Sequence, residues 1–207
     1  MRYWKPSAAL GELISGYHLY GVHALHGQLH HDVFQPAWAN LRFLLTPDSD
    51  WHVRIRTSGW QPVPHCALFG PSSHVTWSRG GSGVVVGIGL TPLGWARFNK
   101  EKAADWANRV GYCDALFGAK LAQFRSHLCE AVDDETVPSL LDAFLIPAMG
   151  IPTDLDTVVV TLDTALLDPD TVTVRALAAR VGVSVRSLER LAERAFGFPP
   201  KLLLRRA

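Results

Sequence analysis

Residues 1–90 show short apolar segments separated by glycine and proline. Residues 51–56 alternate apolar and polar side chains, which is the two-residue period of a half-buried strand. Residues 84–90 are apolar on both faces, so we expect a strand in the middle of a sheet there. We expect further strands at 41–45, 66–69 and 74–77, and a hairpin turn at 80–83. This spacing of short strands predicts an antiparallel sandwich or barrel.

The pattern changes at Thr91 and Pro92, which suit the N-cap and the first position of a helix. Apolar residues at helical spacing then predict a series of helices over residues 93–98, 103–110, 116–132, 139–149 and 154–167. The fold class is therefore α+β. We expect a first domain at 1–150, a connecting helix and linker at 151–170, and a separate all-α unit at 171–207.

The last segment has the pattern of two short helices joined by a glycine turn. Thr173 suits the N-cap of a first helix, and the apolar face of that helix is formed by Val174, Leu177, Ala178 and Val181. Gly182 suits the left-handed residue that ends it. Ser184 suits the N-cap of a second helix over 185–196, with Leu188, Leu191 and Ala195 facing the first, and Gly197 ends it. This arrangement is a helix-turn-helix.

Charge separates this segment from the rest of the chain. From Thr171 onward there are eight basic residues and two acidic ones, a net charge of +6, which leaves −5 for residues 1–170 within the total of +1. A basic segment on an acidic body suits binding to a polyanion such as DNA. A solvated helical surface has the same asymmetry, so charge alone leaves both interpretations open.

The outer face of the second helix carries side chains that can recognise bases. Arginine bonds guanine, serine bonds bases or phosphates, and glutamate accepts from cytosine. The candidates for base contacts are Arg186, Ser187, Glu189 and Arg190, and those for phosphate contacts are Arg194, Lys201 and Arg205. Arg190 can instead pair with Glu189, Glu193 or the first helix. A helical hairpin that binds protein rather than DNA also stays open.

A series of residues in 171–207 resembles the first helix-turn-helix of AraC-type (AraC/XylS) transcriptional regulators. The matching residues, in order, are Leu177, Ala178, Gly182, Ser184, Leu188, Arg190, Gly197, Pro200, Leu204 and Arg205 or Arg206. The resemblance implies a transcriptional regulator that binds double-stranded DNA. Ala192 stands where the family usually has Phe, so we expect a less filled core there, with Phe196 as partial compensation.

The family's DNA-binding region has two such units joined by a long helix, and the segment after Pro200 resembles the start of that helix. This chain ends at Ala207, so we interpret it as cut off after the first unit. One unit makes few phosphate contacts, and affinity grows with their number. We therefore expect weak or absent specific binding by residues 1–207.

The first domain is similar to the cupin-like domain of many AraC-like proteins, on residues 87–98 and 114–118. The resemblance implies a sensory or dimerisation domain. It is dense in aromatic residues, namely Trp4, Tyr17, Tyr20, Phe34, Trp38, Phe43, Trp51, Trp60, Phe69, Trp77 and Trp95. We hypothesise that some line a pocket inside the β domain for a small-molecule effector. The alternative is that they only form the core.

Other chemistry is weakly indicated. The adjacent His30 and His31 would point to opposite faces of a strand, and the sequence has no His-x-His pair. We therefore expect no metal, no cofactor and no enzymatic activity, although a cupin-like small-molecule-binding protein or metalloenzyme with an appended helical domain remains the alternative.

Three cysteines at long spacing predict reduced, mostly buried thiols. The N-terminus lacks a signal-peptide pattern and no apolar run could span a membrane, so we expect a cytoplasmic protein that can form a homodimer.

Overall fold

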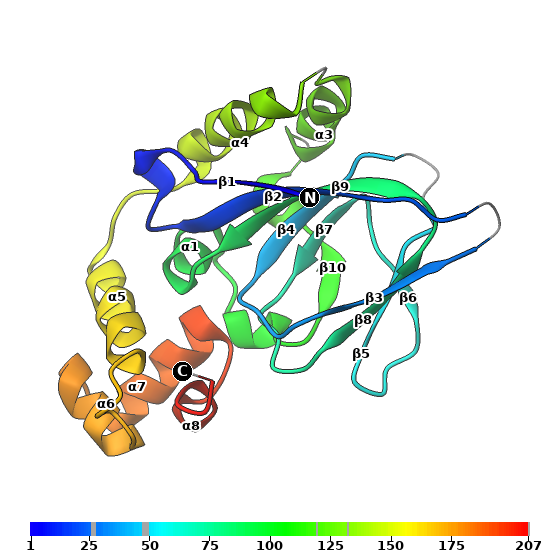
Figure 1. The fold of residues 1–207 in the computed structure, drawn as a ribbon. Helices are drawn as coiled ribbons and strands as arrows, with labels where there is room; N and C mark the ends of the chain where they lie inside the picture. Colours follow the sequence, from blue (N-terminus) through cyan, green and yellow to red (C-terminus); the bar gives the residue numbers. More distant parts are fainter. Residues whose placement is uncertain (26–27, 47–49, 119, 132, 207) are drawn as a thin grey trace.

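A computed structural model describes residues 1–25, 28–46, 50–118, 120–131 and 133–206. Within them, two antiparallel sheets precede a group of C-terminal helices (Figure 1). The larger sheet has the order β1 (Arg2–Trp4), β2 (Ile14–Val22), β9 (Gly83–Leu90), β4 (Asn40–Leu44), β7 (Cys66–Phe69), β10 (Val110–Tyr112). The smaller sheet has the order β3 (His30–Phe34), β8 (Thr76–Gly80), β5 (His52–Ile55), β6 (Gln61–Pro62). The predicted α+β class, antiparallel sheets and central strand at 84–90 are confirmed.

The two faces of the larger sheet pack against different layers, as the pleat requires. Along β4, Leu41 and Phe43 belong to the apolar core shared with the helices, and Leu44 belongs to a second cluster between the two sheets. Val53 of β5 lies in that second cluster and is fully buried. Residues of β4 on the same face as Leu44, such as Arg42, therefore point toward the smaller sheet.

Most of the helices come after β9 in the chain, and helices pack against the larger sheet (Figure 1). They are η1 (Ala8–Leu10), α1 (Pro92–Phe98), η2 (Ala103–Trp106), α2 (Asp114–Phe117), α3 (Lys120–Glu130), η3 (Asp134–Thr136), α4 (Val137–Leu145), η4 (Ile146–Ala148) and α5 (Asp154–Leu166). The predicted cap of α1 is confirmed, because Oγ1 of Thr91 accepts a hydrogen bond of 2.9 Å from the backbone N–H of Gly94. The helix expected over 116–132 is divided into α2 and α3, and Val132 lies outside the described residues.

The helix predicted over 103–110 is wrong. Only η2 is helical, as a 3₁₀ turn, because Asn108 adopts a left-handed φ of 57° that a helix does not tolerate. Val110 then begins β10, which pairs with the edge of β7. Backbone pairing with a distant strand therefore overrides the local helical pattern.

Two predictions for the β region also need correction. The strand expected at 74–77 begins at Thr76 and extends to Gly80. The hairpin expected at 80–83 is wrong, because β8 pairs with β3 and β5 whereas β9 pairs with β2 and β4. Residues 81 and 82 therefore carry the chain from one sheet to the other.

The C-terminal helices are α6 (Val174–Val181), α7 (Val185–Leu191), η5 (Ala192–Phe196, a π-helical turn) and α8 (Pro200–Leu203). One apolar cluster runs from the larger sheet through α1 and α5 to α6 and α7. A largely buried ion pair joins α1 to α5, with Nε of Arg97 2.5 Å from Oδ2 of Asp156. The C-terminal helices are therefore docked against the β domain.

The three cysteines are free thiols as predicted, but only Cys113 is buried; Cys66 is partly buried and Cys129 is exposed. None of the described helices combines the length and the apolar character needed to span a membrane.

Candidate functional site

The turn between α6 and α7 is built by local hydrogen bonds that the sequence predicts. Oγ1 of Thr173 accepts a hydrogen bond of 3.1 Å from the backbone N–H of Ala176, which caps α6. Gly182 ends α6 with a left-handed φ of 74°. Oγ of Ser184 accepts from the backbone N–H of Ser187 at 3.1 Å, which caps α7. The predicted caps and the glycine turn are confirmed.

The two helices bury the side chains that the apolar periodicity selects. Leu177 and Ala178 of α6 and Leu188 and Leu191 of α7 are all buried in the same core cluster. Helix α5 also packs against α6. The pair α6–α7 therefore forms a helix-turn-helix supported by a third helix.

The outer face of α7 is open to solvent. Every residue proposed for base or phosphate contacts is exposed, namely Arg186, Ser187, Glu189, Arg190, Arg194, Lys201 and Arg205. In the described parts of the chain, no ion pair holds Arg186, Arg190 or Arg194. Arg180 differs, because it forms an ion pair with Asp168. Among the described residues, Arg190 therefore forms no ion pair with Glu189 or Glu193, which was the alternative prediction.

The end of α7 turns toward the β domain. The expected single helix over 185–196 contains a π-helical turn at Ala192–Phe196. Phe196 is fully buried and meets the ring of Trp38 edge-on, with 5.6 Å between ring centroids. Ala195, expected to face the first helix, lines a narrow gap with Trp95 and Ala103. The terminal turn of the second helix therefore contacts residues near the larger sheet, namely Trp38, Trp95 and Ala103.

Gly197 makes this contact close. Its φ of 84° is left-handed, and a Cβ on it would lie 2.5 Å from Cγ of Pro71 and 3.0 Å from the carbonyl oxygen of Ala103. A side chain at this position would push the C-terminal unit away from the β domain.

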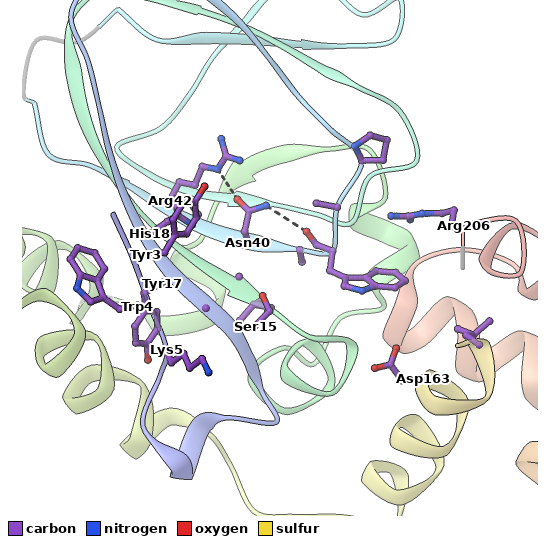
Figure 2. A pocket seen from close by; sticks show the side chains of 18 of the residues that line it. Tyr3, Trp4, Lys5, Ser15, Tyr17, His18, Asn40, Arg42, Asp163 and Arg206 are labelled. Atoms are coloured by element: carbon purple, nitrogen blue, oxygen red, sulfur yellow. Dashed lines mark hydrogen bonds between the residues drawn. The ribbon is translucent and has the colours of Figure 1, made fainter. Parts of the chain in front are cut away.

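A cavity of about 1010 Å³ opens between the larger sheet and the C-terminal helices (Figure 2). Its wall on the β domain includes Tyr3, Trp4, Lys5, Ser15, Tyr17, His18, Trp38, Asn40 and Arg42, and its wall on α5, α8 and the residues next to them includes Asp163, Leu166, Leu167, Leu203 and Arg206. Of the predicted aromatic residues, Trp4, Tyr17 and Trp38 line it, whereas Phe43 and Trp95 lie in the apolar core. The cavity is thus not enclosed by the β domain alone.

Arg42 stands at the sheet end of this cavity (Figure 2) and is 8% exposed. Its guanidinium carbon lies 4.0 Å from the ring centroid of Phe34 and 4.3 Å from that of Phe69. Its Nε donates a hydrogen bond of 2.7 Å to Oδ1 of Asn40, and among the described residues its buried Nη1 makes no hydrogen bond of standard geometry. Tyr20 interacts with Arg42 and partly offsets the effect of burial on its pKa. Burial lowers the pKa of Arg42 from its ordinary value.

The charge of Arg42 acts on its neighbour His18. Burial first, and then repulsion from Arg42, lower the pKa of His18 to about 4. The imidazole is therefore neutral at pH 7. The sequence analysis above did not identify Arg42 as a candidate site residue. A single arginine inside the apolar run 41–45 was the feature that could have indicated it.

Among the described residues, no group of three or more His, Cys, Asp or Glu side chains is arranged to hold a metal ion.

No family model matches the chain, and no curated protein matches it. Two solved structures resemble it at low sequence identity. The crystal structure of the AraC-like transcriptional activator CuxR has a TM-score of 0.41 and 13% identity, covering 99% of this chain and 77% of CuxR. The crystal structure of ToxT from Vibrio cholerae O395 has a TM-score of 0.45 and 10% identity, covering 91% of this chain and 76% of ToxT.

Proposed function

We propose that this protein is a sequence-specific DNA-binding transcriptional regulator of the AraC type. Residues 171–207 would contact double-stranded DNA, residues 151–170 would connect them to the rest, and the β domain at 1–150 would respond to a small-molecule effector. The observation that carries the proposal is the exposed outer face of α7, whose arginines have no ion-pair partner in the described residues although α7 itself is seated on α6.

The placement of the side chains suits entry of α7 into the major groove. Arg186 and Ser187 lie in its first turn, the end that contacts base edges in helix-turn-helix proteins. Glu189 and Arg190 lie one turn further along the exposed face. We assign base contacts to these four residues. The cations beyond them, namely Arg194, Lys201 and Arg205, suit contacts to phosphates.

The proposal also covers the location of the protein, its oligomeric state and the place of the effector. A cytoplasmic location and assembly as a homodimer both accord with a regulator of this type. The effector would occupy the cavity between the larger sheet and the C-terminal helices, since that space has a volume typical of small-molecule sites.

The first test is the salt dependence of binding to duplex DNA. Three phosphate contacts predict that affinity falls about 40-fold between 50 and 200 mM salt, from a slope of about −0.9 per contact. Fluorescence anisotropy of a labelled random-sequence duplex would measure it. Absence of binding at 50 mM salt, or binding that ignores salt, would contradict the proposal. Nanomolar, sequence-selective binding at physiological salt would contradict only our expectation that one unit binds weakly.

The second test is Arg190→Ala, measured on the best sequence selected from a random pool. Loss of a bidentate contact to a base predicts a loss of about 1–3 kcal/mol, or roughly 5- to 150-fold in affinity, together with relaxed preference at one base pair. The control Arg54→Ala removes a cation from β5, which lies outside the helix-turn-helix, and should leave binding unchanged. An equal loss on selected and random DNA would show that Arg190 contacts phosphate and does not recognise a base.

A further inference from the structure

Arginine and tryptophan side chains gather on the outer face of the smaller sheet (Figure 1). Val53 of β5 and Ser78 of β8 point into the molecule and are buried, so the residues that alternate with them point outward. These residues are Arg54 on β5 and both Trp77 and Arg79 on β8, and Arg54 lies directly opposite Trp77. The side chain of Trp77 is 44% exposed, so this face is open to solvent.

The indole of Trp60, just before β6, contacts two guanidinium groups of this face. The guanidinium carbon of Arg79 lies 4.5 Å from the ring centroid of Trp60, and that of Arg54 lies 5.1 Å from it. Arg54 also lies 5.9 Å from the ring centroid of Trp77. Cation–π contacts of this kind hold each guanidinium in place. Two positive charges therefore lie close together at positions that the tryptophan rings define.

Neither arginine is neutralised by the part of the chain that the structure describes. No carboxylate there forms an ion pair with Arg54 or Arg79. The Nε atom of each is buried and makes no hydrogen bond of standard geometry with the described residues. Asp50, just before β5, pairs with His52 instead, with Oδ1 3.1 Å from Nδ1. The two guanidinium groups therefore remain available to an anion from outside the chain.

Carboxylates on a peptide are the anions that this face fits best. A guanidinium presents a planar set of donors that matches a carboxylate, and a guanidinium already held on an indole loses little freedom when it binds. Trp77 adds exposed apolar area next to the charges, and tryptophan and arginine are enriched where protein interfaces bind most strongly. Nucleic acid bases need free aromatic faces, whereas the ring of Trp60 already contacts two guanidinium groups.

We propose that the outer face of the smaller sheet binds an acidic segment of a partner protein, with carboxylates at Arg54 and Arg79 and an apolar side chain against Trp77. This surface lies on the β domain and shares no residue with the helix-turn-helix. The inference therefore does not depend on DNA binding.

The probe is a short synthetic peptide of glutamate and phenylalanine that carries a fluorescent label. Its matched control is the same peptide with glutamine at every glutamate. Fluorescence anisotropy with the full chain at pH 7 and low salt gives the two dissociation constants. We expect the acidic peptide to bind more tightly than its glutamine control. In two-dimensional NMR spectra, we expect the acidic peptide to shift the indole N–H signals of Trp60 and Trp77, which variants at these positions would assign.

His31→Glu is the decisive variant, because it adds an internal competitor without removing a packed group. His31 is exposed on β3 and lies directly opposite Arg79, so a carboxylate there would reach the guanidinium. We expect affinity for the acidic peptide to fall about three- to tenfold. The melting temperature should stay the same or rise. The control His31→Gln changes the same side chain without adding charge, and it should bind the peptide as the unaltered chain does.

Two double variants separate this face from the basic helix-turn-helix, which also attracts anions. Arg54→Gln with Arg79→Gln should weaken the peptide at least as much as His31→Glu does, and if that pair fails to fold, His31→Glu decides. Arg186→Gln with Arg190→Gln should leave the shifts of the two indole signals in place.

Three results would overturn the inference. The first is a loss of less than about twofold in His31→Glu, or an equal loss in His31→Gln. The second is a single-stranded oligothymidylate that shifts the same indole signals and binds this face more tightly than the peptide, which would make the face a nucleic-acid site. The third is a dimer of the unaltered chain that His31→Glu dissociates, measured by light scattering, which would assign the face to a second copy.

Discussion

Phe196→Ala is expected to lower the free energy of unfolding by about 3–5 kcal/mol, the usual cost of removing a phenyl ring from a core. The ring is fully buried, it contacts Trp38 edge-on, and it lies in the turn that seats the C-terminal helices on the β domain. Alanine would leave a cavity at this junction, because Ala192 and Ala195 beside it are too small to fill the space. Urea unfolding followed by tryptophan fluorescence and by circular dichroism measures the change.

The control for this variant is Val185→Ala, in the same helical unit but 42% exposed. It removes apolar atoms that are partly in solvent, so we expect a change within about 0.5 kcal/mol. A second expectation is that Phe196→Ala makes the C-terminal helices more sensitive to proteolysis than the β domain. A loss in stability below about 1 kcal/mol would mean that Phe196 does not join the two parts as described.

Acidification from pH 7 to pH 4 is expected to reduce stability through His18 by up to about 3 kcal/mol. The ordinary histidine pKa is 6.5, and burial together with the charge of Arg42 lowers the pKa of His18 to about 4. Between these two values the unfolded chain binds a proton that the folded chain does not. Stability contributed by the neutral imidazole is therefore complete above pH 6.5 and is lost as the pH falls toward 4, at about 1.4 kcal/mol for each unit.

The comparison that isolates this effect is His18→Gln, measured by urea unfolding at several pH values between 4 and 7. Glutamine does not titrate, so the stability of the variant should depend less on pH than that of the unaltered chain. The imidazole lies over Gly87, where a Cβ on residue 87 would come within 2.0 Å of Nε2 of His18. Parallel stability curves for the two proteins would show that His18 titrates normally in the folded state.

Docking of the helix-turn-helix on the β domain has a consequence for regulation. The cavity and the contacts of Phe196 and Gly197 all lie at the boundary between the same two parts. Under the proposed function, an effector in the cavity would contact α5 and α8, and α7 would carry the cations that contact DNA. Coupling between the two sites would therefore require no further element.

Local chemistry let the sequence predict the elements that depend on neighbouring residues. Thr173, Gly182 and Ser184 specify their caps and turn through hydrogen bonds within a few residues and through a φ that glycine adopts freely. The apolar run 84–90 specifies a central strand because it is short, rich in β-branched residues and apolar on both faces, as a strand inside a sheet requires. The exposure of Arg186 and Arg190 likewise follows from the helical period once the buried face is known.

Only the tertiary structure decided the features that depend on distant residues. Residues 103–110 have helical spacing, but Val110 begins β10, which pairs with β7. The paired residues of these two strands are about forty positions apart in the chain. The burial of Arg42 between two phenyl rings, and the seating of Phe196 on Trp38, arise where separate layers meet, and no period within the sequence records which layers will touch. The sequence by itself determined the helix-turn-helix and the β-rich character of the first domain, because these rest on local hydrogen bonds and on the periodicity of burial. The docking and the cavity were decided by packing between elements, whose energy depends on surfaces that exist only after folding.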